Sequence, residues 1–189
     1  IAHVLESAEQ TSASRIFVST HHQTLLDDLA DPVVERLGER LVIVPAADNL
    51  ADSVLAVADR AEFPLFITTA DNCLLTPATI AEIGGEAARL GAGAGVALAR
   101  REDVLAVHPE GQRRFYEFSD VAVSNCNAYW IGDRAALKAA EAFRGGGQFV
   151  KKPIRVMQAF GLINLLRFRF GLGPIHHIFR RISHHLKID

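Results

Sequence analysis

The sequence lacks long hydrophobic runs and has few cysteines. No stretch of about 18 uninterrupted apolar residues occurs, so we expect no transmembrane helix. The first residues are amphipathic rather than basic and then apolar, so we expect no signal peptide. Cys73 and Cys126 are too few for a disulfide framework, and a reducing cytoplasm is the expected location. Internal repeats are absent too, which excludes a repeat protein.

Each part of the chain is short of one sign of charge. Residues 1–143 contain 11 Lys and Arg against 21 Asp and Glu, a net charge of −10, whereas residues 144–189 contain 9 against 1, a net charge of +8. An acidic body with a basic tail predicts that the tail meets an anionic surface. Three such surfaces stay open: the acidic body of the same chain, a second subunit in a homodimer, and an anionic membrane. We expect no nucleic-acid partner.

The alternation of strand and helix patterns predicts an α/β fold. With 189 residues, 49% of them hydrophobic and 22% charged, the chain can form one globular domain with an appendage. Strands are predicted at 15–20, 41–45, 65–69 and 96–99, and helices at 2–10, 21–37, 49–61 and 77–90. This rhythm is typical of a mainly parallel sheet that helices cover on both faces.

From residue 100 onward the rhythm changes. Residues 113–118 and 121–131 predict two strands of an antiparallel excursion, the second interrupted by polar residues. Further helices are predicted at 134–143, 153–170 and 175–186. We therefore divide the chain into an α/β core, residues 1–145, and a basic helical tail, residues 146–189, packed on or beside that core.

One aspartate stands alone at the end of a buried strand. The apolar residues 65–67 lead through small polar residues to Asp71, and Thr76 and Pro77 then begin a helix. In open α/β sheets, ligands bind at the carboxyl edge. A lone carboxylate there suits Mg²⁺, which needs only one or two carboxylates besides phosphate oxygens and water. The alternative is that Asp71 only caps the following turn.

Polar residues after the second strand are expected at the same edge. Asp48, Asn49 and Ser53 open the next helix, where amides and a small hydroxyl can bind the base or ribose of a nucleotide. Simple helix capping explains Asp48 and Asn49 equally well.

The apolar strand at 121–131 contains a polar stretch. Ser124, Asn125 and Asn127 must find hydrogen-bond partners there, because unpaired buried amides are costly. A ligand is one partner, and the backbone of the sheet is the other. We take these three residues, with Asn72 beside the lone aspartate, as candidates for binding the substrate.

The basic tail adds cationic candidates. Lys151 and Lys152 follow a Gly-rich loop and could bind an anionic acceptor or the leaving pyrophosphate, although a solvated helix start is the alternative. Arginines interleaved with apolar residues suit a helix pair on anionic lipid, a dimer interface, or packing on the acidic body. No carboxylate or thiol joins the histidine pairs at 176–177 and 184–185, so we assign them to the surface or to packing.

Three segments together carry a resemblance to a known family. Ile-Thr-Thr-Ala-Asp-Asn-Cys-Leu-Leu-Thr-Pro, at 67–77, resembles the metal-aspartate segment of the nucleotidyltransferases, which include the molybdenum-cofactor guanylyltransferase-like NTP transferases. Arg-Arg-Phe-Tyr-Glu-Phe-Ser-Asp, at 113–120, and Ser-Asn-Cys-Asn-Ala-Tyr-Trp-Ile, at 124–131, resemble a bacterial subgroup of that family. The resemblance spans residues 1–145.

The resemblance implies both a fold and a reaction. The fold is a three-layer α/β/α sandwich with a mostly parallel mixed sheet, as in nucleotide-diphosphosugar transferases, plus a C-terminal helical appendage. The reaction is attack by a small phosphorylated or polar acceptor on the α-phosphate of an NTP, with Mg²⁺, releasing pyrophosphate. Asp71 would be the metal ligand, Asn127 and Ser124 would lie on the acceptor side, and Ser53 would lie near the base.

The sequence departs from the family pattern in three places. The Gly-rich first loop that holds the triphosphate has no counterpart, nor does a second metal carboxylate, and Cys73 stands where the family usually has proline. We expect the sequence to be incomplete at both ends. Two alternatives stay open: a non-catalytic nucleotide- or membrane-binding member of the same fold, and a glycosyltransferase that uses a nucleotide-sugar.

Overall fold

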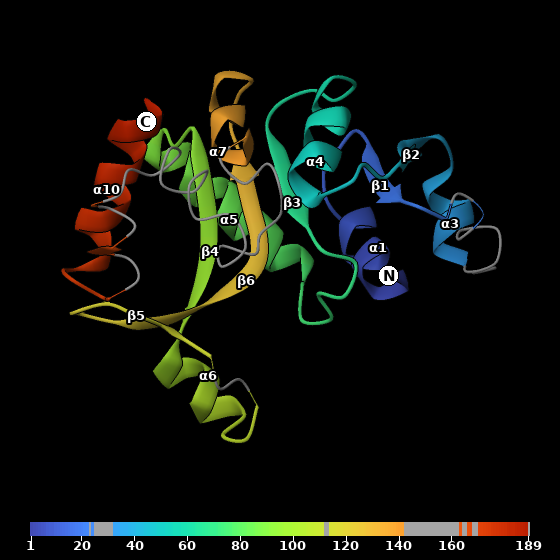
Figure 1. Ribbon diagram of the computed structural model, residues 1–189. Coiled ribbons are helices and arrows are strands. Elements are labelled where there is room, and N and C mark those ends of the chain that lie inside the picture. The colour runs from blue at the N-terminus through green and yellow to red at the C-terminus, as the bar shows by residue number, and fades with distance from the viewer. Residues whose placement is uncertain are drawn as a thin grey trace.

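The computed structural model describes residues 1–22, 24, 32–111, 114–141, 163, 166–167 and 170–188. Their elements are, in order, α1 (Ala2–Glu9), β1 (Ile16–Thr20), α3 (Pro32–Leu37), the 3-10 helix η1 (Gly38–Arg40), β2 (Leu41–Pro45), α4 (Leu50–Ala58), β3 (Leu65–Thr68), α5 (Pro77–Leu90), β4 (Ala94–Arg100), α6 (Arg101–Val107), β5 (Tyr116–Glu117), β6 (Ala122–Ile131), the 3-10 helix η2 (Ala135–Leu137), α7 (Lys138–Glu141) and α10 (Ile175–Leu186). The predicted mixed α/β class is confirmed (Figure 1). Lys151, Lys152 and most of the helix predicted at 153–170 lie outside the described residues.

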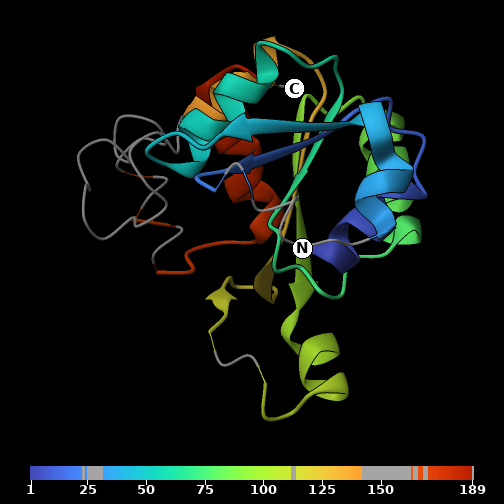
Figure 2. The same cartoon turned by 90° about the vertical axis from the view of Figure 1, so that its right-hand side faces the viewer.

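The described strands form two sheets rather than one. β1 and β2 pair in parallel, from Ile16 opposite Leu41 to Thr20 opposite Pro45. The larger sheet has the order β3-β6-β4, with β5 on β6, and all of its pairings are antiparallel. In Figure 2, β1 and β2 lie across the direction of β3 and β4.

The prediction of a mostly parallel sheet is therefore not met by the larger sheet. β3 and β4 do run in the same direction, because each is antiparallel to β6, but β6 lies between them. The crossover helix α5 sets the relative direction of the two strands that it connects. It does not decide whether they are neighbours, and the long strand of the excursion occupies the position between them.

Helices cover both faces of the larger sheet. Successive residues of a strand point to opposite faces. Trp130 of β6 lies against α5, where a Cβ on Gly84 would come within 3.3 Å of its ring. Ile131, the next residue, belongs to a buried cluster with Ala58 of α4 and Leu137 of η2. Figure 2 shows α5 on one side of this sheet and α4 and α10 on the other.

The β1–β2 sheet has a core of its own, and α1 links it to the loop after β3. The buried members of this core are Leu5, Val33 and Leu37. On α1, the buried hydroxyl of Ser7 donates a hydrogen bond of 2.9 Å to the carbonyl oxygen of Leu75. α1 thereby helps to fix the position of the loop that carries the lone aspartate.

α10 docks on the antiparallel part of the core. Ile178 is only 2% exposed and clusters with Phe118 and Val123. Just before the helix, the backbone comes so close to β5 that a Cβ on Gly171 would lie 2.5 Å from the carbonyl oxygen of Glu117. The φ angle of +60° at Gly171 also favours glycine. Among the described residues, no helix has both the length and the hydropathy of a bilayer span.

Candidate functional site

The turn after β3 leaves the carboxylate of Asp71 in solvent. Backbone hydrogen bonds donated by Asn72 and Cys73 close a tight turn around it. Thr76 caps α5, because its hydroxyl accepts the N–H of Thr79 at 3.1 Å. Since Thr76 supplies the cap, the exposed Asp71 carboxylate is not needed to begin the helix.

Asn72 fastens this turn to β6. Its Nδ2 donates to Oγ1 of Thr68 at 3.1 Å and to the carbonyl oxygen of Cys126 at 3.0 Å. We call this pair of hydrogen bonds the Asn72 latch. Asp71 precedes Asn72 and Asn127 follows Cys126, so the latch brings the aspartate turn beside the polar stretch of β6.

β6 bulges where it meets the latch. Asn125 lies opposite Leu98 and Tyr129 lies opposite Val96, so four steps along β6 match two steps along β4. Asn127, in the middle, has a φ angle of +51°. Among residues with a side chain, asparagine adopts this left-handed conformation several times more often than most, and the conformation occurs in turns as well as at functional sites. Bulges re-aim side chains and are frequent next to active sites.

Asn125 holds the bulge in shape. Its Nδ2 donates to Oη of Tyr129 at 2.6 Å, and its Oδ1 accepts the N–H of Asn127 at 2.9 Å. The polar stretch thus finds part of its hydrogen bonds within the sheet itself. Asn125 and Asn127 are nevertheless exposed, whereas Ser124 is buried at 8% exposure.

Sequence reasoning missed two residues of this region. Tyr129 lies two residues beyond Asn127, and the period-two alternation of a strand was a signal that could have found it. Thr69 extends β3 toward the aspartate turn, and its Oγ1 is buried without a hydrogen-bond partner among the described residues. Buried hydroxyls are normally satisfied, so this one marks a place where a polar partner fits.

The thiol of Cys126 is partly buried. Burial raises the pKa of its thiol, and this effect exceeds the lowering caused by a hydrogen bond with the backbone of Ala99. A thiol held protonated is a poor nucleophile. Cys126 contributes to this region through its backbone carbonyl oxygen, which accepts a hydrogen bond from Asn72.

The residues predicted to bind the nucleotide base act within their own turn. Asn49 caps α4, accepting the N–H of Asp52 at 3.0 Å and donating to its carboxylate at 2.6 Å. Ser53 is buried, and its Oγ accepts the N–H of Ala47 at 3.0 Å. Asp48 is exposed. These hydrogen bonds stay within residues 47–53. β2 runs across the direction of β3, so the carboxyl ends of these two strands do not point the same way (Figure 2).

Replacing Asn49 by alanine tests whether this residue is a cap. The variant is expected to lose about 1 kcal/mol of unfolding free energy, because one N–H of α4 loses its partner. Chemical denaturation measures this loss, and a nucleotide titration of the same variant separates capping from ligand binding. Asn49→Ser, which keeps an acceptor at the cap, is the matched control. An alanine variant of unchanged stability but weaker nucleotide affinity would show instead that Asn49 binds the ligand.

The single carboxylate of Asp71 suits a metal ion that is coordinated mainly by its substrate. Among the described residues, no group of three or more His, Cys, Asp or Glu side chains could enclose a metal ion. Asp71 offers one exposed carboxylate beside the latch. Mg²⁺ that is coordinated by phosphate oxygens and water needs only one or two carboxylates. Asp71 therefore fits a metal of that kind, and a site built of protein groups alone does not fit the described residues.

The fold is shared with a solved structure, although the sequences differ. That structure, described as a hypothetical transferase structure from Thermus thermophilus, matches with a TM-score of 0.63 and 16% sequence identity. The match covers 78% of this chain and 63% of that chain. This chain therefore spans less than two thirds of the length of that protein. No family model and no curated protein matches the sequence. The likeness identifies a common mixed α/β fold.

Proposed function

We propose that this protein is a transferase, and specifically a Mg²⁺-dependent nucleotidyltransferase. It moves a nucleoside monophosphate from an NTP to a small phosphorylated or polar acceptor. The observation that carries the proposal is the Asn72 latch, which holds the exposed Asp71 beside the bulge at Asn127. The transferase description of the Thermus thermophilus neighbour, a protein of the same fold, is consistent with this class.

The proposed reaction exchanges one phosphorus–oxygen bond for another. An oxygen of the acceptor bonds to the α-phosphorus as the bond from that phosphorus to the α–β bridging oxygen breaks. The electron pair of the broken bond leaves with pyrophosphate, and a hydroxyl acceptor releases its proton to solvent. Such a transfer needs positioning and charge neutralisation rather than a protein nucleophile. When bound, Mg²⁺ supplies that neutralisation, and Asp71 is the residue that would hold it. In this proposal the exposed amide of Asn127 orients the acceptor.

We include the architecture in the proposal. Helices on both faces of the larger sheet are compatible with the three-layer sandwich of nucleotide-diphosphosugar transferases. In that arrangement the carboxyl end of β3 is the edge at which ligands are expected. Lys151 and Lys152, outside the described residues, remain proposed contacts for the acceptor or the pyrophosphate.

A thermal-shift screen of nucleoside triphosphates, with and without Mg²⁺, tests the proposal. At about 100 times the dissociation constant, one NTP is expected to raise the melting temperature by about 5–10 °C, only when Mg²⁺ is present. Asp71→Asn should abolish the Mg²⁺-dependent part of this shift. If no NTP stabilises the protein, the proposal that it binds a nucleotide is wrong. A shift that Asp71→Asn leaves intact would instead support a nucleotide-binding module without a metal at this aspartate.

A further inference from the structure

α10 carries a row of cationic and imidazole groups on its solvent side, which we call the cationic face. Its exposed residues are His176, His177, Arg180, Arg181, His184, His185 and Lys187. They recur at intervals of four, and residues four apart share one side of a helix. The sequence between Pro174 and Ile188 contains no Asp or Glu. The face therefore bears one sign of charge along the whole helix.

Apolar packing, rather than these charges, holds α10 on the core. Ile175, Ile178 and Ile182 belong to the buried cluster around Phe118 and Val123. With that side occupied, the arginines of the opposite side remain exposed. α10 therefore packs on the body of its own chain, which was one of the expectations from sequence, but it does so through apolar side chains that leave Arg180 and Arg181 exposed. Interaction with the helix dipole explains cations in the last turn but not Arg180 or Arg181, which precede it.

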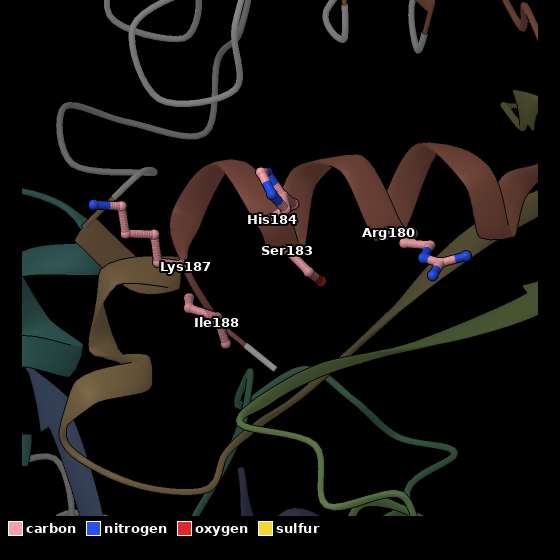
Figure 3. Close-up of a pocket in the computed structure, with 5 residues that line it drawn as sticks. All are labelled: Arg180, Ser183, His184, Lys187 and Ile188. Carbon is pink, nitrogen blue, oxygen red and sulfur yellow. The ribbon is translucent and has the colours of Figure 1, made fainter.

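An open cavity of about 470 Å³ flanks the end of the cationic face. Its lining residues are Arg180, Ser183, His184, Lys187 and Ile188. Figure 3 shows them following one another along α10 and past its C-terminal end. Among the described residues, the lining offers guanidinium, imidazole, ammonium and hydroxyl donors and no carboxylate. These are the groups that bind a phosphate or carboxylate headgroup.

Exposed apolar side chains lie in the chain just before the helix. Leu172 is 58% exposed and Phe170 is 64% exposed, and upstream of them Ile163 is 65% exposed. The apolar side of α10 is occupied by the core, so the apolar groups available to a lipid interface are these exposed side chains, while the basic residues of the helix attract anionic headgroups. We propose that the cationic face of α10 docks on an anionic phospholipid bilayer, with Leu172 and Phe170 entering the headgroup region.

A bilayer fits this surface better than other anionic partners do. A nucleic acid would be bound by the arginines and its bases could stack on Phe170, but the exposed aliphatic side chains of Leu172 and Ile163 would have no partner. A second copy of the acidic body would likewise meet the charges and leave those aliphatic side chains in water. A bilayer accommodates both, since lipid headgroups attract basic residues and the region beneath them accepts apolar groups.

Vesicle co-sedimentation of the full chain tests the proposal. At low salt the protein is expected to sediment with phosphatidylcholine vesicles that contain about one third phosphatidylserine, but not with phosphatidylcholine alone. Salt should release it by screening the charges. Arg180→Gln with Arg181→Gln should weaken partitioning about 30-fold. Leu172→Ser should also weaken it, although the charge is unchanged.

The control removes the same charge from another surface. Arg60→Gln with Arg89→Gln takes two exposed arginines from the turn after α4 and from α5, and should partition like the unmodified protein. Circular dichroism melts check that every variant is folded. The proposal is overturned if the full chain ignores phosphatidylserine vesicles at low salt, or if the control loses as much binding as the α10 variant. It is also overturned if Arg180→Gln with Arg181→Gln dissociates an oligomer, or if an oligonucleotide displaces the vesicles.

Discussion

Asp71→Asn is expected to lower the rate of pyrophosphate release about 1,000-fold or more. Under the proposed mechanism, Asp71 holds the metal that neutralises charge at the α-phosphate, and this lowers the activation barrier by several kcal/mol. Asparagine has nearly the same shape but no charge. Because the side chain is exposed, its removal should change the unfolding free energy by less than about 0.5 kcal/mol. A coupled phosphate assay with the best NTP and a panel of acceptors gives the rate.

Two further variants make this expectation specific. Asp59→Asn removes the same charge from another exposed position, where Asp59 pairs with Arg134 at 3.1 Å, and should leave the rate unchanged. Asp71→Glu keeps the charge but displaces it, so it should retain part of the activity at raised Mg²⁺ concentration. If Asp71→Asn turns over like the unmodified protein, this carboxylate is not the metal ligand and the proposed mechanism is wrong.

Local signals made the segment around Asp71 predictable. Pro77 fits the first turn of a helix and Thr76 fits its cap, so the start of α5 follows from neighbouring residues alone. The same holds for α10 over Ile175–Leu186, whose apolar residues repeat with helical spacing. The prediction of an antiparallel excursion is also confirmed, because the alternation at 113–118 and the strand-like stretch at 121–131 can be recognised without a distant partner, and β5 pairs with β6 antiparallel.

Elements decided by distant contacts escaped prediction. α6 has no side-chain cap. Its first residue, Arg101, pairs with Glu117, and its guanidinium carbon lies 5.0 Å from the centre of the Phe115 ring. Neither contact follows from residues 101–107 themselves. The position of β6 between β3 and β4 is a long-range choice of the same kind. A sequence pattern gives the approximate bounds of a strand, but it does not identify the strand that pairs with it.

The same difference between local and distant contacts decides which parts of the candidate site could be predicted. Asp71 at the end of a strand was predicted, because strand and turn signals are local. The latch from Asn72 to Cys126 was not, since that carbonyl is placed by the bulge of β6. The polar residues at 124–127 indicated an irregularity, but the left-handed conformation of Asn127 requires the register against β4. Spatial neighbours of the aspartate therefore came from the structure.

Ile178→Ala is expected to lower the free energy of unfolding by about 2–5 kcal/mol. Ile178 is 2% exposed and is the fully buried residue of α10 in the cluster with Phe118 and Val123. The truncation removes buried methyl groups and leaves a cavity, and both effects destabilise the folded state. A loss of this size is a large share of the total for a domain whose stability is typically about 5–15 kcal/mol. Urea denaturation followed by circular dichroism measures it.

Controls separate packing from helix propensity and local from global unfolding. His177→Ala places the same residue at the exposed neighbouring position and should stay within about 0.5 kcal/mol of the unmodified protein. Ile178→Val keeps most of the side chain and should cost about 0.5–1.5 kcal/mol. Hydrogen exchange reports which amides lose protection: exchange confined to residues 175–186 would mean that α10 detaches alone. An alanine variant as stable as its parent, with α10 amides equally protected, would show that this helix is not part of the cooperative core.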